Sequence, residues 1–242
     1  MFSARQLFTA TALIGATLGL GSVTPAKAGV VVKSSGPSAA EYPVGKKLDD
    51  AASVTLRDGD AITVLTGAGT RILRGPGTHR VGARGASKRT AFAMLTRQRS
   101  GARVRTGAVR GGTGDAMPHN SNLWNVDVTQ AGKVCLATDE TIGFWRPSLA
   151  GEETWVLGSA VSDFHVHVTF ADGDATASLG AEELPLGQNR IYGFSGPDGG
   201  PAQRVEFVLL ETVPDNPEDL AVALAQNGCN GQLDLLSERL AG

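Results

Sequence analysis

Glycine and proline divide most of this chain into short runs of residues, and this punctuation restricts the possible folds more than any other feature. The sequence holds 32 glycines among its 242 residues. Many of them stand beside Asp, Pro or another Gly, which are the residue types that tight turns require. The runs between these turns often alternate apolar with polar residues, as half-buried strands do. The pattern predicts short strands joined by tight turns.

Two regions carry this strand pattern. From Gly29 to about Pro76 the alternation predicts a meander of short antiparallel strands. From Leu123 onward, eight short runs over about 90 residues fit a β-sandwich of immunoglobulin-like type better than an α/β plan. The sequence Asp-Gly-Asp-Ala occurs once in each region, at 58–61 and 172–175, and we expect both copies to form hairpin turns. The eight expected strands are 123–128, 133–137, 142–145, 154–157, 164–170, 175–179, 189–194 and 204–210.

Helical spacing of apolar residues appears in two other places. Residues 86–99 predict a helix, and residues 101–122, rich in Gly and Pro, predict a loop. Near the C-terminus, Asn216 is a suitable N-cap, Pro217 suits the first helical position, and Gly228 ends the helix. A second short helix is expected after Cys229, from the spacing of three leucines (Leu233, Leu236 and Leu240).

The first 28 residues have the three parts of a secretory signal peptide. Arg5 lies in a short N-terminal region, residues 7–23 are apolar or small, and Ala26-Lys27-Ala28 ends in a small-x-small cleavage pattern. The residue after the expected cut is Gly29, so the cysteine that a lipoprotein needs there is absent. No later window is apolar enough to span a bilayer. We therefore expect an exported protein, periplasmic or secreted, with no transmembrane anchor after signal cleavage.

The two cysteines, Cys135 and Cys229, are interpreted in the light of that compartment. An even number of cysteines in an exported chain favours a disulfide. The alternative is two buried free thiols, because free cysteine packs as a small apolar side chain. A Cys135–Cys229 disulfide would attach the helical tail to the second β-domain, and the chain-entropy model gives it roughly 4 kcal/mol of stabilisation.

These observations predict a mainly β fold in two units. A small N-terminal β-meander module and an immunoglobulin-like β-sandwich are expected, with a connecting helix and a short C-terminal helical tail. The expected ranges are 1–28 for the signal peptide, 29–80 for the small β-module, 81–122 for the Arg-rich helix and loop linker, 123–213 for the β-sandwich and 214–242 for the tail.

Positive charge is concentrated in one segment. Residues 71–110 hold ten arginines and one lysine, with no Asp or Glu, although the net charge of the whole chain is −2. Arginine is the preferred partner for carboxylate and phosphate groups, so the segment predicts contact with an anionic envelope component or an acidic protein. The alternatives are arginines that pair with acids of the same chain, or that are merely solvated. The candidate contact residues are Arg74, Arg80, Arg84, Arg89, Arg97, Arg99, Arg103 and Arg105.

Nucleic acid is a poor fit as the partner of this segment. An exported protein is in the wrong compartment for it, and the segment lacks the interleaved aromatic residues on which bases stack. We therefore predict no nucleic-acid binding.

His165 and His167 are the only histidines close together in the sequence. Two residues apart on a strand, they share a face and together would supply two metal ligands. The apolar residues Phe164, Val166, Val168 and Phe170 are expected to occupy the opposite, core-facing side. Two ligands rarely define a metal site, so simple exposure is the favoured interpretation and no cofactor is predicted.

No sequence motif identifies catalytic residues. Gly193-Phe194-Ser195-Gly196 misses the G-x-S-x-G nucleophile elbow by one position. The paired acids at 152–153 and 182–183 lie in expected loops, and the three tryptophans, Trp124, Trp145 and Trp155, are expected to fill a core rather than form an exposed sugar platform. We predict a non-catalytic protein. A hydrolase acting on cell-envelope polymers, assembled from residues distant in sequence, is the alternative.

Three short motifs follow one another in the first β region. They are an apolar strand at 30–32, Gly-x-x-Leu at 45–48 and Gly-Asp-x-Ile at 59–62. In this order, residues 30–78 resemble FecR-type periplasmic β-modules, and the whole chain is similar to exported proteins of the Gram-negative envelope. The resemblance implies envelope signalling or ligand contact. The expected function is binding or scaffolding in the envelope, with a periplasmic signalling module as a further alternative.

Overall fold

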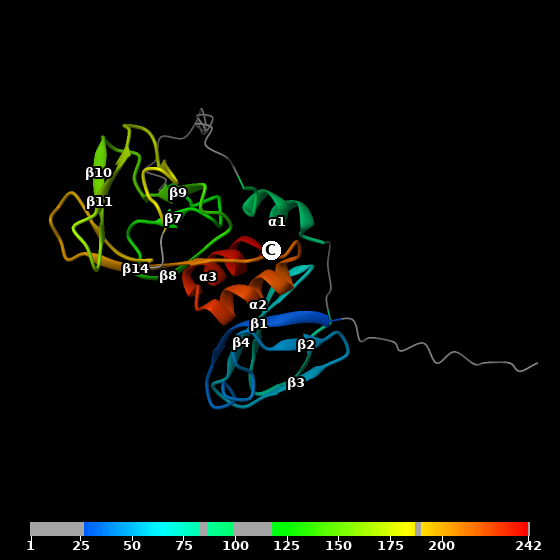
Figure 1. Ribbon diagram of the computed structural model, residues 1–242. Coiled ribbons are helices and arrows are strands. Elements are labelled where there is room, and N and C mark those ends of the chain that lie inside the picture. The colour runs from blue at the N-terminus through cyan, green and yellow to red at the C-terminus, as the bar shows by residue number, and fades with distance from the viewer. Residues whose placement is uncertain (1–26, 83–86, 99–117, 187–189, 242) are drawn as a thin grey trace, which may run out of the picture.

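Two β-units enclose a small group of helices in this protein (Figure 1). The computed structural model describes residues 27–82, 87–98, 118–186 and 190–241. The blue and cyan strands form the N-terminal unit, the green, yellow and light orange strands form the second, and the C-terminal helices lie between them (Figure 1). The mainly β fold with a C-terminal helical tail is confirmed.

The N-terminal module is built from six strands in two small sheets. The larger sheet has the order β2-β1-β4-β5 and the smaller pairs β3 with β6, all antiparallel. The order is not sequential, so the simple meander was wrong: β3 and β6 leave the first sheet and pair with each other. Their bounds are β1 (Lys27–Ser35), β2 (Lys47–Asp49), β3 (Ser53–Leu56), β4 (Ala61–Thr66), β5 (Gly69–Arg74) and β6 (Gly77–Arg80). Alternate residues of both sheets face one apolar core, which contains Val31, Leu48, Val54, Leu56, Ile62, Val64 and Leu73.

Strand β1 begins two residues before the expected cleavage point. Lys27 and Ala28 belong to it, and Lys27 pairs with Asp49 of β2. The last two residues of the expected signal peptide therefore belong to a strand of the N-terminal module. The rest of the expected signal peptide, residues 1–26, lies outside the described residues.

The turn between β3 and β4 is organised by a buried carboxylate. Asp60 is 3% exposed and accepts hydrogen bonds from the backbone N–H groups of Ser38, at 2.8 Å, and Arg57, at 2.5 Å. Gly59 has φ 79°, a left-handed conformation that favours glycine. The first Asp-Gly-Asp-Ala copy thus carries the chain from one sheet to the other. It is not the hairpin turn that the sequence predicted.

The second unit is a two-layer sandwich of eight strands. One sheet has the order β11-β10-β13-β14-β8, the other the order β12-β9-β7. The bounds are β7 (Val126–Asp127), β8 (Gly132–Leu136), β9 (Thr141–Trp145), β10 (Glu153–Ser159), β11 (His165–Phe170), β12 (Thr176–Gly180), β13 (Ile191–Ser195) and β14 (Gln203–Leu209). Its core lies between the sheets and includes Val126, Leu136, Phe144, Leu157, Val168, Phe170, Phe194 and Phe207. Most pairs are antiparallel, but β8 runs parallel to β14 and β7 parallel to β9.

Two details of the sandwich differ from the prediction. The expected strand 123–128 is reduced to Val126–Asp127, because Asn122 accepts a hydrogen bond from the backbone N–H of Trp124 and bends the chain into a turn. Phe164 was expected in the core and is 37% exposed. It stands before the first residue of β11, in the loop that follows β10.

A fully buried arginine holds two loops at one end of the sandwich. Arg146, 0% exposed, donates hydrogen bonds to the backbone carbonyls of Asp174 (3.0 Å), Gly151 (2.7 Å) and Ala171 (3.1 Å). Its Nη1 lies 3.3 Å from the Glu153 carboxylate, and its guanidinium lies over the Phe170 ring, 5.3 Å from the centroid. Arg146 therefore ties the segment after β9 to the second Asp-Gly-Asp-Ala turn. This turn joins β11 to β12, which belong to different sheets, so it is not the predicted hairpin turn either.

Three helices are described. They are α1 (Arg89–Leu95), α2 (Pro217–Asn227) and α3 (Asn230–Arg239). The predicted capping of α2 is confirmed: the Asn216 side chain accepts a hydrogen bond from the backbone N–H of Asp219, and Gly228 ends the helix with φ 73°. The first helix is shorter than the predicted 86–99, both ends of which lie outside the described residues, and most of the expected loop lies there too.

The helices form a third apolar core between the two β-units. Val30, Val32 and Leu65 of the N-terminal module and Leu123 and Trp124 of the second unit meet the apolar faces of all three helices there. The sequence placed the tail on the sandwich alone, and the structure shows that it contacts the module as well. The contacts with the module include a hydrogen bond from the backbone N–H of Thr70 to the carbonyl of Leu240 and ion pairs Lys47–Asp219 and Lys33–Asp234.

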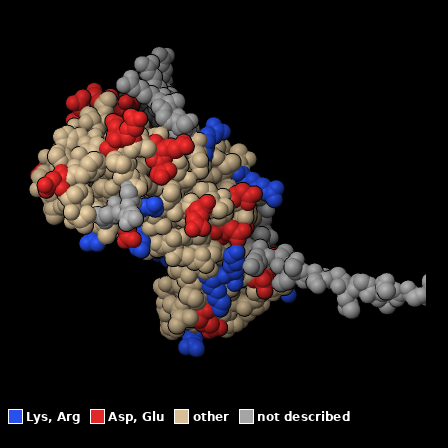
Figure 2. All heavy atoms as spheres, viewed as in Figure 1, with Lys and Arg blue, Asp and Glu red and all other residues tan. Residues whose placement is uncertain are grey.

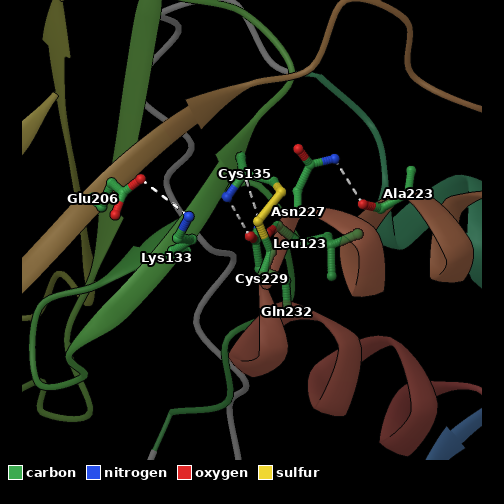
Figure 3. Close-up of a disulfide and its surroundings, with 8 residues drawn as sticks. All are labelled: Leu123, Lys133, Cys135, Glu206, Ala223, Asn227, Cys229 and Gln232. Carbon is green, nitrogen blue, oxygen red and sulfur yellow. Dashed lines mark hydrogen bonds and ion pairs between the residues drawn. A yellow bond between two sulfur atoms is a disulfide. The ribbon is translucent and has the colours of Figure 1, made fainter. Parts of the chain in front are cut away.

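A disulfide fixes the tail to the sandwich (Figure 3). Cys135 of β8 is bonded to Cys229, which stands between α2 and α3, and both are fully buried. Beside them Gln232 accepts a hydrogen bond from the backbone N–H of Cys135 at 2.6 Å and donates to the Cys135 carbonyl at 2.8 Å (Figure 3). It also donates to the Leu123 carbonyl at 2.9 Å. The Gln232 amide thus hydrogen-bonds both backbone groups of Cys135 at the outer edge of β8, as a neighbouring strand would. The predicted disulfide is confirmed.

Candidate functional site

The Arg-rich segment is only partly within the described residues. Four of its eight candidate contact residues are described: Arg74 ends β5, Arg80 ends β6, Arg89 begins α1 and Arg97 follows α1. All four are exposed. The other four, Arg84, Arg99, Arg103 and Arg105, lie outside the described residues.

The four described arginines are distributed over two strands of the N-terminal module and the two ends of α1. Arg74 and Arg80 belong to the N-terminal module, whereas Arg89 and Arg97 stand at opposite ends of α1, roughly 12 Å apart along the helix axis. Arg71, half-buried between them, has a structural role: its Nη1 donates to the carbonyls of Val81, at 3.3 Å, and Gly82, at 3.1 Å. The arrangement suits a polymer or a surface better than a single small anion.

Four acidic residues form ion pairs in the described part of the chain, and their partners lie outside the Arg-rich segment. Within the described ranges, the ion pairs are Lys33–Asp234, Lys47–Asp219, Lys133–Glu206 and Arg146–Glu153. None of these four bases belongs to residues 71–110. Among the described residues, Arg74, Arg80, Arg89 and Arg97 make no ion pair. Pairing with the described acids, the main alternative from the sequence, therefore does not account for them.

The two β-units differ in charge. Residues 29–82 contain seven basic and five acidic residues, and residues 123–213 contain four basic and thirteen acidic residues. On the face shown in Figure 2, acidic side chains predominate over the sandwich, the upper-left lobe. Such separation orients the molecule in the field of a charged partner, because the basic part is attracted to an anionic surface while the acidic part is repelled.

His165 and His167 lie side by side on the exposed face of β11. Their ring centroids are 5.7 Å apart and both side chains are exposed. The sequence placed them on this outward face, and the structure agrees. Within the part of the chain that the structure describes, no group of three or more His, Cys, Asp or Glu could hold a metal ion, so His79, His119 and the described acids do not complete a site within one chain.

The candidates for catalysis gain no support from their positions. Both cysteines are in the disulfide, so neither is a free thiol nucleophile. Ser195 is the last residue of β13 and pairs with Val156 of β10. Of the three tryptophans, Trp124 is buried and donates its indole N–H to the Thr96 carbonyl at 2.9 Å, whereas Trp145 and Trp155 are half-buried at the sandwich. None of the three is an exposed platform for a sugar.

Comparisons with known proteins identify no relative of this chain. A scan against protein-family models, a search of curated proteins and a search of solved structures found no match to it. In addition, no helix among the described residues has the length and apolar character needed to cross a membrane.

Proposed function

We propose that this chain is an exported, non-catalytic binding protein whose basic side contacts an anionic component of the cell envelope. The observation that carries the proposal is that Arg74, Arg80, Arg89 and Arg97 are exposed and, among the described residues, make no ion pair, although the chain has more acidic than basic residues. Exposed guanidinium groups that are not neutralised within the chain are available to carboxylate or phosphate groups of a partner.

Export is part of the same proposal. The signal-peptide pattern of residues 1–28 supports it, and so does the buried Cys135–Cys229 disulfide, since disulfides persist in oxidising compartments. In the envelope, the abundant polyanions are acidic glycans and the phosphates of lipids. Their shared chemistry is a dense array of oxyanions, which an extended set of arginines matches.

The joint between the units supports a scaffolding role. Tail helices that pack on both β-units, with a covalent link to the sandwich, hold the basic module and the acidic sandwich in a fixed relation. Such a molecule binds an anionic surface with one side and presents the other side to a different partner. FecR-type modules, which residues 30–78 resemble, act in ligand contact in the envelope.

Binding to an anionic matrix tests the proposal. We expect the purified chain to be retained on heparin at low salt and to elute as salt screens the charges. Replacing the four exposed arginines together (Arg74→Ala, Arg80→Ala, Arg89→Ala and Arg97→Ala) should lower the eluting salt concentration at least two-fold. The matched control is Lys133→Ala with Arg204→Ala, which removes positive charge from the acidic sandwich and should leave elution nearly unchanged.

Circular dichroism and the melting temperature of each variant check that folding is retained. Equal elution of the wild type and the fourfold variant would overturn the proposed contact surface. The control removes two charges and the fourfold variant removes four, so an equal loss per charge removed would also overturn it, since it would show a response to net charge alone.

A further inference from the structure

We propose that His165 and His167 form half of a divalent transition-metal site, which a second copy of this chain completes. The inference is independent of the anion-binding surface, because β11 lies on the side of the sandwich remote from α1 and from the N-terminal module, where the four exposed arginines stand (Figure 1). It begins with the geometry of the two rings. They project from the same face of one strand with centroids 5.7 Å apart, close enough for two imidazole nitrogens to reach one ion.

A hydrogen bond sets the tautomer of the first ring. His165 Nδ1 lies 3.2 Å from the backbone carbonyl oxygen of Asp163. A carbonyl oxygen only accepts, so Nδ1 carries the proton and the lone pair of the neutral ring is on Nε2. This is the arrangement found in metal-binding histidines, whose second nitrogen donates to a carbonyl or a carboxylate and so orients the ligand.

The strand neighbours leave space above the two rings. His165 stands opposite Gly158 of β10, and a Cβ atom added to Gly158 would meet nothing within 4 Å. His167 stands opposite Val156, which carries no polar group. Imidazole ligands without carboxylates suit Zn²⁺, Cu²⁺ or Ni²⁺ and do not suit Ca²⁺ or Mg²⁺, which prefer oxygen.

One chain supplies only these two ligands. Within the described residues no third His, Cys, Asp or Glu joins them. A closed zinc site needs four ligands in a tetrahedron, so two must come from elsewhere.

The edge of β11 offers a place where a second copy of the chain would supply the two missing ligands. β11 ends the five-stranded sheet and, among the described strands, pairs only with β10 there. The backbone N–H of Ser159 donates to the Phe164 carbonyl, so Phe164 and alternate residues after it face β10, and the peptide groups of His165 and His167 face outward. No Pro, Lys or bulge, the usual protections of an edge, occurs in the strand.

Antiparallel pairing of β11 with the same strand of a second copy is symmetric about Val166. In that register His165 stands opposite His167 of the second copy, and the reverse pair forms by symmetry. Directly opposite residues in an antiparallel pair have Cβ atoms about 5 Å apart, so four imidazoles gather on one face of the joined sheet. The site is incomplete in a single chain and complete in a twofold dimer.

Zinc titration tests the proposal. In sedimentation velocity, we expect the purified chain to double its mass on addition of Zn²⁺ and to return to its starting mass with EDTA. Calorimetry should give one Zn²⁺ per two chains. His165→Gln and His167→Gln should each weaken zinc binding at least ten-fold and abolish the zinc-dependent mass change. The matched control is His79→Gln, a histidine of the N-terminal module whose Nε2 contacts the Arg74 carbonyl, and it should behave as the wild type.

Three results would overturn the proposal. The first is no zinc-dependent change in the mass of the wild type. The second is a mass change that persists when both His165 and His167 are replaced. The third is a zinc-loaded monomer, since it would show that the pair binds metal without a second copy.

Discussion

The N-terminal module and the sandwich contain the same turn sequence, but buried side chains of opposite charge anchor it. In each unit the sequence Asp-Gly-Asp-Ala carries the chain from one sheet to another, with a left-handed glycine at its second position, φ 79° at Gly59 and φ 80° at Gly173. In the module the third residue, Asp60, is buried and accepts backbone N–H groups. In the sandwich the third residue, Asp174, is exposed, and the buried charge beside the turn is Arg146, which donates to backbone carbonyls.

The difference shows that the turn sequence determines the local bend but not how the turn is anchored. The anchor depends on which backbone groups, N–H donors or carbonyl acceptors, the neighbouring segments direct toward it. Beside Asp60 these groups are N–H donors, which a carboxylate satisfies. Beside Arg146 they are carbonyl oxygens from two loops, which a guanidinium satisfies because it has five donors in a fixed plane. A buried group without such partners would cost several kcal/mol.

Removing the anchor of the sandwich should have the largest effect. Arg146→Ala removes the hydrogen bonds to three backbone carbonyls and the ion pair with Glu153, and it opens a cavity beside Phe170. We expect it to lower the free energy of unfolding by about 5 kcal/mol, the upper end for breaking a buried charged network. Urea denaturation followed by tryptophan fluorescence measures this. The control is Arg204→Ala, which replaces an exposed arginine of the same β-sandwich. It should change the free energy of unfolding by less than about 0.5 kcal/mol.

A loss of under about 1 kcal/mol for Arg146→Ala would contradict the comparison, because it would mean that water replaces the guanidinium at no cost. Arg146→Lys separates charge from geometry. Lysine keeps the positive charge but lacks the planar fork, so we expect it to recover less than half of the loss.

The disulfide distinguishes the two units in another way. The tail is covalently attached to the sandwich through Cys135, whereas it contacts the module through apolar packing, hydrogen bonds and partly exposed ion pairs. The double variant Cys135→Ala with Cys229→Ala should lower the free energy of unfolding by about 4 kcal/mol, as the loss of a crosslink over a sequence separation of 94 implies. Urea denaturation with and without dithiothreitol measures it.

Reductant should destabilise the wild type to a similar extent and leave the double variant unchanged, which makes the variant its own control. Native-state hydrogen exchange then locates the effect. We expect faster exchange at β8, α2 and α3 than at β1 and β4 in the double variant. Equally faster hydrogen exchange in both β-units would contradict the idea that the tail is attached more strongly to the sandwich than to the module.

Strand content and helix caps could be predicted from the sequence, because they depend on local patterns. Turn residues and period-two alternation located seven of the eight expected sandwich strands, and Asn216 and Gly228 marked the limits of α2. The sheet order could not be predicted, since the exchange of β3 and β6 into their own sheet depends on long-range pairing. The tail contacts with the module were missed for the same reason: the cysteine pair pointed only to the sandwich.

The buried polar residues were missed although the sequence carries a signal for them. Asp60 is in phase with Ile62 and Val64, and Arg146 is in phase with Ile142 and Phe144, so both continue an inward-facing strand position. Gln232 likewise belongs to the helical stripe of Cys229, Leu233 and Leu236. The expected turn at 58–61 and the expected strand end at residue 145 left Asp60 and Arg146 outside the predicted strands. In this chain such residues satisfy the backbone where elements meet.

Among the candidate site residues, the outward direction of His165 and His167 followed from alternation, and the disulfide followed from the even number of cysteines and the expected export. The spatial relation of the arginines did not, because Arg74, Arg80, Arg89 and Arg97 belong to three elements whose placement depends on the third core. That third core is formed by residues from both β-units and all the described helices, so no single segment of the sequence predicts it.

The smallest effect is expected at the anchor of the module, and it should depend on pH. Burial opposes the charge of Asp60, but the hydrogen bonds from Ser38 and Arg57 outweigh it and lower the pKa of this carboxyl below its ordinary value. A lowered pKa in the folded state means that the ionised group stabilises the fold above its unfolded pKa of about 3.9 and that this contribution is lost as the pH falls through the folded pKa. The hydrogen-bond partners of Arg146 are backbone carbonyls, which carry no titratable proton.

Asp60→Asn tests this asymmetry. The variant should be less stable than the wild type at pH 7, because the amide N–H₂ group cannot accept the second of the two backbone N–H bonds, and the difference should shrink as the pH falls from about 5 to about 2. Thermal unfolding across that range measures it. Asp58→Asn, an exposed carboxylate of the same turn, is the control and should follow the wild type. A stability difference between Asp60→Asn and the wild type that stays constant over the whole range would mean that the carboxylate acts by shape and not by charge, and the contrast between the two anchors would then be one of geometry alone.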